Sequence, residues 1–303
     1  MMRSKSSQIL FLFTLVCILA PACAAAPRWR FTINDGWQFI GSDFADAHKN
    51  GIETRAWQKV NLPHTWNIAD TLDDEPGYRR GISWYRKQLS IGPDLNGKRI
   101  FLYFEGVNQT TEVFVNERSV GSHIGGYTAF AFDITGIIKI GEPNTIAIKV
   151  DNTLVNDIPP LDADFNMHGG IYRDVWIIAA NDVHIKMTDM ASSGVVIKTP
   201  QVSENAATVS VSGTVVNAAG SARRLEAFSS IVDASARVVG TAKSNVNAPA
   251  KGESNFTHAD IRISRPKLWS PDSPYLYRVR TVIRDNGKEI DEVAEPLGFR
   301  WFK

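Results

Sequence analysis

The chain has 303 residues, of which 33 are Lys or Arg and 32 are Asp or Glu, so its net charge is +1. No segment concentrates the basic residues, and the composition therefore argues against nucleic acid as a partner. This length is sufficient for two domains.

The first 26 residues have the pattern of a secretory signal peptide. A positively charged start precedes an apolar run from Ile9 to Ala22, which is short for a membrane span. Small-residue cleavage sites follow at residues 22–24 and 24–26. We therefore expect an exported protein, periplasmic or extracellular, with no transmembrane segment. Lipid anchoring through Cys23 is the alternative to simple cleavage.

Both cysteines, Cys17 and Cys23, lie within this expected signal. A mature chain without cysteine has no disulfide, no thiolate metal site and no thiol nucleophile. The spacing of His64, His123 and His168 matches no compact ligand pattern, so no metal site is predicted.

Short apolar runs separated by turn residues follow along the chain. Arg99–Phe104, Thr111–Val115 and Thr145–Val150 have the composition and alternation of strands. Ser42 to Thr54 is expected to hold a short helix at most, because no window shows a sustained helical period. This pattern predicts β-sandwich domains.

The composition changes near Asn181. Six of the eight tryptophans precede it, whereas Ala, Ser and Val dominate residues 191–250. The clearest hairpin of the second part is Arg278 to Glu292, with Asp285-Asn286-Gly287 at its turn. We predict an all-β chain with one domain at 27–181 and a second at 182–303.

The stretch from Asp162 to Val175 is the richest in polar chemistry. It combines acids, an Asn, a His, two glycines and an Arg, and it leads at once into the apolar run 175–178. Such loops are where binding and catalytic residues are usually presented.

Several segments in this chain resemble the family 2 glycoside hydrolases, the β-galactosidase and β-glucuronidase family, and occur in that family's order. They include Leu62-Pro63-His64-Thr65-Trp66-Asn67, Gly81-Ile82-Ser83-Trp84-Tyr85-Arg86, Gly170-Ile171-Tyr172-Arg173 and Gly298-Phe299-Arg300. The resemblance implies a jelly-roll (galactose-binding-like) sugar-binding domain followed by an immunoglobulin-like β-sandwich. In that family a (β/α)8 barrel follows the Gly-Phe-Arg motif and carries two catalytic glutamates. This sequence stops at Lys303, so it is similar to the non-catalytic N-terminal part of such an enzyme, and no catalytic residue is expected in it.

The same resemblance indicates candidate sugar-binding residues. Asp164 corresponds to an acid that reaches into the sugar site, and Asn166 and His168 share its loop. Arg80 lies in a second loop expected to border the sugar pocket. No cofactor is expected, although a monovalent cation near Asp164 becomes feasible once a barrel supplies the other ligands.

Each candidate also has a structural interpretation. Asp164 can cap backbone N–H groups or pair with Arg173, and Arg80 can belong to a solvated loop neutralised by the acids at 73–75. Asp162 and Asp164 would share one face of a strand, but we do not favour them as a catalytic pair.

The leading hypothesis is therefore the N-terminal part of an exported β-galactosidase-type enzyme, which in its intact form hydrolyses terminal β-glycosides with retention. Its partners would be carbohydrate and a catalytic barrel. Two alternatives remain: a free-standing carbohydrate-binding module, and a split enzyme subunit that docks on a separately encoded barrel.

Overall fold

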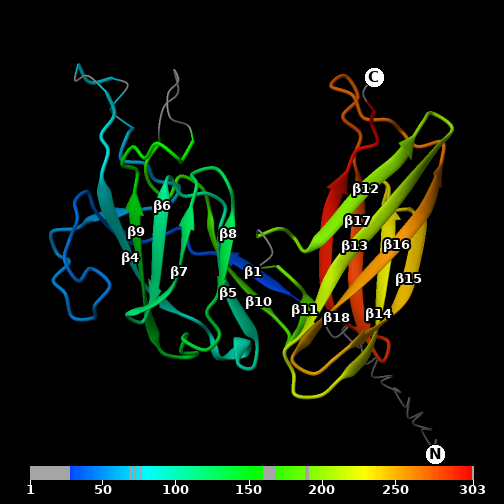
Figure 1. The fold of residues 1–303 in the computed structure, drawn as a ribbon, viewed down its shortest axis with the longest axis horizontal. Helices are drawn as coiled ribbons and strands as arrows, with labels where there is room; N and C mark the ends of the chain where they lie inside the picture. The colour runs from blue at the N-terminus through cyan, green and yellow to red at the C-terminus, as the bar shows by residue number, and fades with distance from the viewer. Residues whose placement is uncertain are drawn as a thin grey trace, which may run out of the picture.

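The computed structural model describes residues 28–68, 70, 72–74, 77–159, 168–187 and 191–301. Within these ranges the protein is all-β, and its one helical element is the 3-10 turn η1 (Pro93–Leu95). The expected all-β fold is confirmed. The strands form two sandwiches, a jelly roll followed by an immunoglobulin-like sandwich, side by side in Figure 1. No helix in this part of the chain is long and apolar enough to cross a membrane.

The first sandwich packs a four-stranded sheet, β1-β10-β5-β8, against a six-stranded sheet, β3-β2-β4-β9-β6-β7. Neighbouring strands pair antiparallel throughout. The strands are β1 (Trp29–Thr32), β2 (Trp37–Ile40), β3 (Gln58–Val60), β4 (Ile82–Ser90), β5 (Arg99–Phe104), β6 (Thr110–Val115), β7 (Arg118–Ile124), β8 (Phe130–Asp133), β9 (Pro143–Asp151) and β10 (Val175–Ala180).

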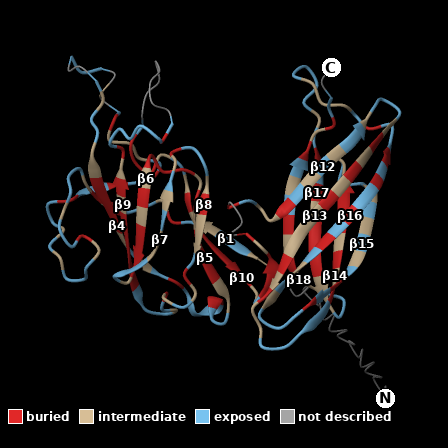
Figure 2. Cartoon of the chain, in the orientation of Figure 1, coloured by how far each residue is buried: buried red, intermediate tan, exposed pale blue. Residues whose placement is uncertain are grey.

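The second sandwich packs the sheet β11-β13-β12, extended by β16 on β13, against the sheet β15-β14-β17-β18. Its strands are β11 (Val183–Ile185), β12 (Val195–Val202), β13 (Ala206–Asn217), β14 (Arg223–Val232), β15 (Val238–Ala248), β16 (Gly252–Ser264), β17 (Tyr277–Asp285) and β18 (Lys288–Leu297). Buried and exposed residues alternate along these strands, as Figure 2 shows, because one face of each sheet covers the core.

Each sandwich has its own apolar core. The first is built around side chains such as Trp37, Tyr85 and Phe104, none of them exposed, and the second around Phe299 and Ile231. Burying one large apolar side chain contributes about 1.5–3 kcal/mol, so two independent cores of this size can each hold a sandwich together.

The segment 41–57 contains no helix, so Ser42 to Thr54, where a short helix at most was expected, holds none. It runs through turns, and Trp57 and Ala47 cover Trp84 and Phe114 on the outer face of the six-stranded sheet. Its apolar residues therefore pack onto the sheet and do not form the apolar stripe of a helix. Within this segment Gly51 has a positive φ of 74°.

Polar contacts join the two sandwiches. Lys98 Nζ donates to Asn181 Oδ1 at 2.6 Å, and the amide of Asn181 donates to the carbonyl of Ile290 at 2.5 Å. Arg28, which precedes β1, forms an ion pair with Asp291 of β18 at 2.6 Å. The residue before the first strand is thus tied to the last strand.

A polar row runs through the second sandwich at His258. Its ring nitrogens lie 3.0 Å from Ser229 Oγ and 3.1 Å from Ser244 Oγ, and Ser229 in turn lies 3.0 Å from Thr281 Oγ1. His258 is buried, and burial lowers its pKa, opposed by a hydrogen bond to the backbone of Ala227.

This lowered pKa predicts a stability that falls as the pH falls. The unfolded chain protonates the imidazole near pH 6.5, whereas the folded protein does so only at lower pH. The stabilising contribution is therefore complete above about pH 6.5 and is lost as the pH falls toward the folded-state pKa. His258→Gln should lose less of its thermal midpoint than the parent chain between about pH 8 and about pH 5. Equal losses would show that the imidazole does not drive the pH dependence.

Candidate functional site

The candidate loop meets the first sandwich through the segment from His168 to Asp174, which leads into β10. His168 is exposed and begins the described part of this segment. Asp164 and Asn166 lie outside the described residues. The geometry on which the site rests is therefore the base of the loop and the neighbouring segments that hold it.

The base of the loop is fixed by the segment Leu62–Asn67. The N–H of Gly169 donates to Asn67 Oδ1 at 2.6 Å, and its carbonyl accepts from the N–H of Trp66 at 3.3 Å. One step further, the N–H of His64 donates to the carbonyl of Ile171 at 2.8 Å. Three hydrogen bonds thus join segments about a hundred residues apart.

A second anchor lies at Gly170. Gly170 and Asn108 exchange backbone hydrogen bonds of 3.1 and 3.0 Å. The phenol of Tyr172 also donates to the carbonyl of Gly126. The loop base is thereby fastened on the side of β6 as well.

Two buried amides connect this base to the loop that carries Arg80. Asn67 Nδ2 donates to the carbonyl of Arg79 at 2.9 Å and to Asp70 Oδ2 at 2.5 Å. Asn152 Nδ2 donates to the same carbonyl at 3.2 Å, and Asn152 Oδ1 accepts from the N–H of Gly81 at 2.8 Å. Buried amides satisfied in this way hold their backbone partners in one arrangement.

The structure therefore brings Arg80 and His168 to the same end of the sandwich. Asn67 bonds the residue before Arg80 and the residue after His168, and both candidate side chains are exposed. Arg80 Nη1 donates to the carbonyl of Asn152 at 3.3 Å, a long contact, and the residue as a whole is exposed. Asn67, Asn152 and the backbone groups that they bond form a frame that holds both side chains in place. A cation and an imidazole held in this way can bind the oxygen atoms of a sugar.

The titratable pair beneath this frame has a structural role. His64 Nδ1 lies 2.7 Å from the hydroxyl of Tyr85. Burial lowers the pKa of His64, and burial raises the pKa of Tyr85 far above its ordinary value despite hydrogen bonding with the backbone of Ile171 and the charge of Arg79. Both groups are thus neutral near neutral pH, so they position the frame and carry no charge into it.

The same end exposes apolar side chains in its loops and at the end of β7: Ile68, Leu72, Ile124, Tyr127, Leu154 and Val155. Ile68 and Leu72 are 77% and 87% exposed. Exposed apolar residues gathered around a polar site are typical of a surface that another body covers.

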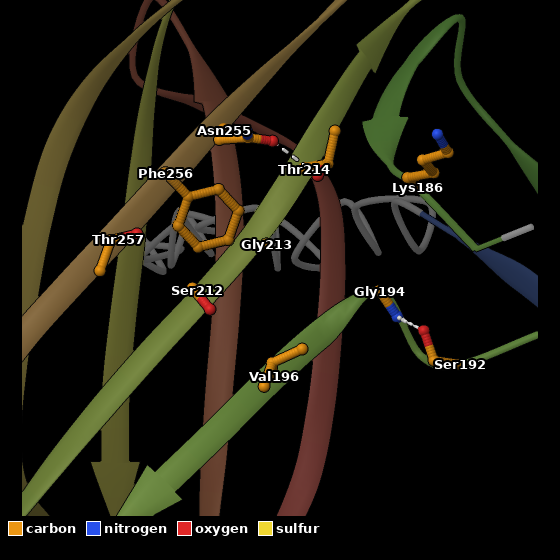
Figure 3. Close-up of a pocket in the computed structure, with 10 residues that line it drawn as sticks. All are labelled: Lys186, Ser192, Gly194, Val196, Ser212, Gly213, Thr214, Asn255, Phe256 and Thr257. Atoms are coloured by element: carbon orange, nitrogen blue, oxygen red, sulfur yellow. Dashed lines mark hydrogen bonds between the residues drawn. The ribbon is translucent and has the colours of Figure 1, made fainter. Parts of the chain in front are cut away.

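The second sandwich offers fewer groups for binding a ligand. A hollow of about 290 Å³ lies over β12, β13 and β16. Its lining residues, drawn in Figure 3, are mostly Ser, Thr, Gly and Val. Thr214 Oγ1 already donates to Asn255 Oδ1 at 2.8 Å, and Lys186 pairs with Glu253 at 2.9 Å. Phe256 is buried beneath Gly213 and presents no ring for stacking. Within the described ranges no group of three metal-ligating side chains was found.

Family models identify both sandwiches. The model described as "Glycosyl hydrolases family 2, sugar binding domain" matches residues 30–180, and "Glycosyl hydrolases family 2" matches residues 188–300. The chain belongs to glycosyl hydrolase family 2. The resemblance drawn from the sequence motifs is confirmed.

Named relatives are longer enzymes. A β-glucuronidase of Bacteroides fragilis is 36% identical over 294 residues, which cover 96% of this chain and 40% of the relative. A β-galactosidase of Bacteroides ovatus is 32% identical, and the match covers 93% of this chain and 33% of that relative. The crystal structure of a Bacteroides uniformis β-glucuronidase superposes with a TM-score of 0.86 at 37% identity, over 91% of this chain and 33% of that one. The chain thus spans about a third to two fifths of these relatives.

Sequence reasoning named Arg80 and His168 as candidates but missed the residues that hold them. Asn67 and Asn152 carry the frame, and both are buried polar residues. Asn152 directly follows strand β9, which ends at Asp151. Asn67 is the last residue of the Leu-Pro-His-Thr-Trp-Asn motif. An amide directly after a strand is the available signal for a loop anchor.

Proposed function

We propose that this chain is the substrate-contacting N-terminal part of an enzyme that hydrolyses terminal β-glycosides with retention, with β-glucuronides as the preferred class. The observation that carries the proposal is the shared frame of Arg80 and His168, which holds two exposed polar side chains at one end of the sugar-binding sandwich. The 36% identity to a β-glucuronidase supports it.

A cation at this position favours an acidic sugar. The exposed guanidinium of Arg80 can form a two-point contact with the carboxylate of a uronic acid, the pairing for which its planar fork is suited. A neutral galactoside gives it no charge to meet. The related Bacteroides uniformis β-glucuronidase 2 has been solved covalently bound to cyclophellitol-6-carboxylate aziridine. A covalent adduct is in keeping with a retaining mechanism.

The arrangement of the two sandwiches supports the presence of a further catalytic body. In Figure 1 the cyan loop before β4 and the green loop after β9 lie on the side of the molecule where the chain's C-terminus emerges from the second sandwich. A barrel that followed the chain would cover the exposed Ile68 and Leu72 and complete the sugar pocket. Asp164 and Asn166, from the same loop as His168, would then also face the sugar.

A chimera tests this proposal. We expect this chain alone to show no turnover of aryl β-glucuronides or β-galactosides. Fused through its C-terminus to the region of the Bacteroides fragilis β-glucuronidase that follows the matched segment, it should support hydrolysis of the glucuronide. In that chimera Asp164→Asn and Arg80→Ala should each lower kcat/KM by about tenfold to a hundredfold, as expected for the loss of one charge-assisted hydrogen bond.

The stability of the same variants separates binding from folding. Asp164→Asn should leave the thermal midpoint of this chain nearly unchanged, because a carboxylate that meets a ligand has no partner to lose in the free protein. Arg55→Ala, at a pair whose side chains are 93% and 70% exposed, is the control for a lost charge. A midpoint lowered by several degrees, with full activity in the chimera, would make Asp164 a structural cap. Saturable sugar binding by this chain alone would instead favour a free-standing carbohydrate-binding module.

A further inference from the structure

A hollow of about 750 Å³ lies at the other end of the first sandwich. It is formed by the segment 50–51, β4, the turn between β6 and β7, the segment 136–139 and the start of β9. β9 runs from this hollow at Pro143 to the candidate sugar site at Asn152, and its rise of about 3.3 Å per residue places the two roughly 25–30 Å apart. The hollow is therefore separate from the frame of Arg80 and His168.

The inner wall of this hollow contains a buried guanidinium. Arg86 on β4 is 4% exposed, and its Nη1 donates to the carbonyl of Ala47 at 2.6 Å. That is the one hydrogen bond of its side chain within the described residues, and none of their carboxylates forms an ion pair with it. A guanidinium has five N–H donors, and a buried charge is costly unless it is paired. Burial lowers the pKa of Arg86, and the charge of Glu117 opposes this.

The rim of the hollow adds more positive charge than negative. Arg118 and Lys139 line it together with one carboxylate, Glu117. Glu117 Oε1 already accepts from the N–H of Asn50 at 2.6 Å. Lys139 lies 3.9 Å from Glu142, with both side chains mostly exposed, and such a surface pair contributes little. Three cations thus line the hollow with one carboxylate, Glu117, which is partly engaged, while Glu142 lies outside the lining beside Lys139.

Amides and a hydroxyl give the hollow a fixed polar wall. Thr145 Oγ1 donates to Asn50 Oδ1 at 2.9 Å and accepts from Gln88 Nε2 at 2.8 Å. Asn116 Nδ2 donates to the carbonyl of Ile137 at 3.1 Å, and Asn116 Oδ1 accepts from the N–H of Thr145 at 3.0 Å. The wall is therefore organised before any ligand arrives. Its volume is within the range of small-molecule sites and exceeds what an inorganic anion needs.

We propose that this hollow is a second ligand site, which binds the carboxylate of an acidic sugar through Arg86, Arg118 and Lys139. Arg86 supplies the deep contact, Arg118 and Lys139 close over the carboxylate at the rim, and the amide wall meets the ring hydroxyls. The site stands independently of the proposed function, because it is contained in the first sandwich and lies away from the loops that carry Arg80 and His168.

The test follows the side-chain Nε–H resonance of Arg86 by NMR in the whole chain. Sodium glucuronate is titrated against glucose at matched ionic strength, and sodium phosphate forms a third arm. We expect glucuronate to shift this resonance saturably and glucose to leave it in place. Arg118→Ala combined with Lys139→Ala should weaken glucuronate binding by about tenfold or more, the loss expected for charge-assisted hydrogen bonds.

Two further variants make the test specific. Lys198→Ala removes a cation from β12 in the second sandwich and should leave glucuronate binding unchanged. Glu117→Gln keeps an acceptor for the N–H of Asn50 but removes the competing charge, so it should tighten binding. Equal shifts with glucuronate and glucose, or an unaffected Arg86 resonance, would refute the site. Binding of phosphate in preference to glucuronate would make it an inorganic anion site and overturn the sugar assignment.

Discussion

Replacing Asp291 with alanine is expected to cost the chain about 3–5 kcal/mol of unfolding free energy, the usual penalty for removing one member of a buried ion pair. The Asp291 side chain is fully buried. Its oxygens accept from Arg28 Nε at 3.0 Å, from Arg28 Nη2 at 2.6 Å and from the N–H of Ile185 at 2.7 Å. Alanine would leave a nearly buried guanidinium and a buried backbone N–H without this partner.

The Arg28–Asp291 pair joins the two sandwiches, so its loss should affect how they unfold relative to each other as well as their stability. Arg28 precedes the first strand of the first sandwich, whereas Ile185 and Asp291 belong to β11 and β18 of the second. Its loss should therefore loosen the joint between the sandwiches and separate their unfolding into two transitions. Urea unfolding followed by tryptophan fluorescence measures this, since six of the eight tryptophans precede residue 181.

The control is Arg55→Ala. It removes an ion pair with Glu53 in which the two side chains are 93% and 70% exposed. Exposed pairs contribute about 0–1 kcal/mol, so this variant should unfold almost as the parent does. If Asp291→Ala and Arg55→Ala unfold at the same urea concentration, the ion pair at the joint does not stabilise the chain.

The strands were predictable from the sequence because their signals are local. Arg99–Phe104 is strand β5 as expected, and Thr111–Val115 and Thr145–Val150 lie within β6 and β9. The hairpin turn at Asp285-Asn286-Gly287 joins β17 and β18, and Asn286 and Gly287 both have positive φ. Alternation and turn chemistry act over a few residues, which is the range that inspection of a sequence covers well.

The frame of the candidate site was not predictable in the same way. The bond from the N–H of Gly169 to Asn67 joins residues 102 positions apart, and nothing local to either residue indicates the other. The buried Arg86 illustrates a second limit. The run Ser83 to Arg86 is buried on both faces, because segment 41–57 covers the outer face of the sheet. Such a cover arises from tertiary packing, and alternation within β4 does not predict it.

Replacing Gly170 with alanine is the second change for which we expect a large effect, about 2–5 kcal/mol of lost stability from combined overpacking and backbone strain. Its φ is 122°, a conformation that residues with a side chain rarely adopt. A Cβ atom would lie 2.6 Å from the hydroxyl of Tyr85 and 2.7 Å from the carbonyl oxygen of His64. The backbone contact cannot be relieved by a rotamer change.

The damage should be greatest at the base of the candidate loop. Gly170 exchanges two backbone hydrogen bonds with Asn108, and Gly169, beside it, donates to Asn67. Any shift that relieves the new Cβ therefore moves the group that holds Arg80 and His168 together. In the chimera with the glucuronidase barrel, Gly170→Ala should lower kcat/KM for the glucuronide as well as the thermal midpoint.

Gly220→Ala is the control, because it makes the same Gly-to-Ala change at a position without close neighbours. Gly220 lies in the second sandwich, and a Cβ there would meet no atom within 4 Å. Its replacement should change stability by no more than about 0.5 kcal/mol, as at ordinary surface positions. Thermal unfolding of both variants decides the matter. If the two midpoints agree and Gly170→Ala keeps full activity, the close approach at Gly170 does not hold the loop. If Gly170→Ala alone is destabilised and inactive, the close approach at Gly170 is what positions the base of the candidate loop.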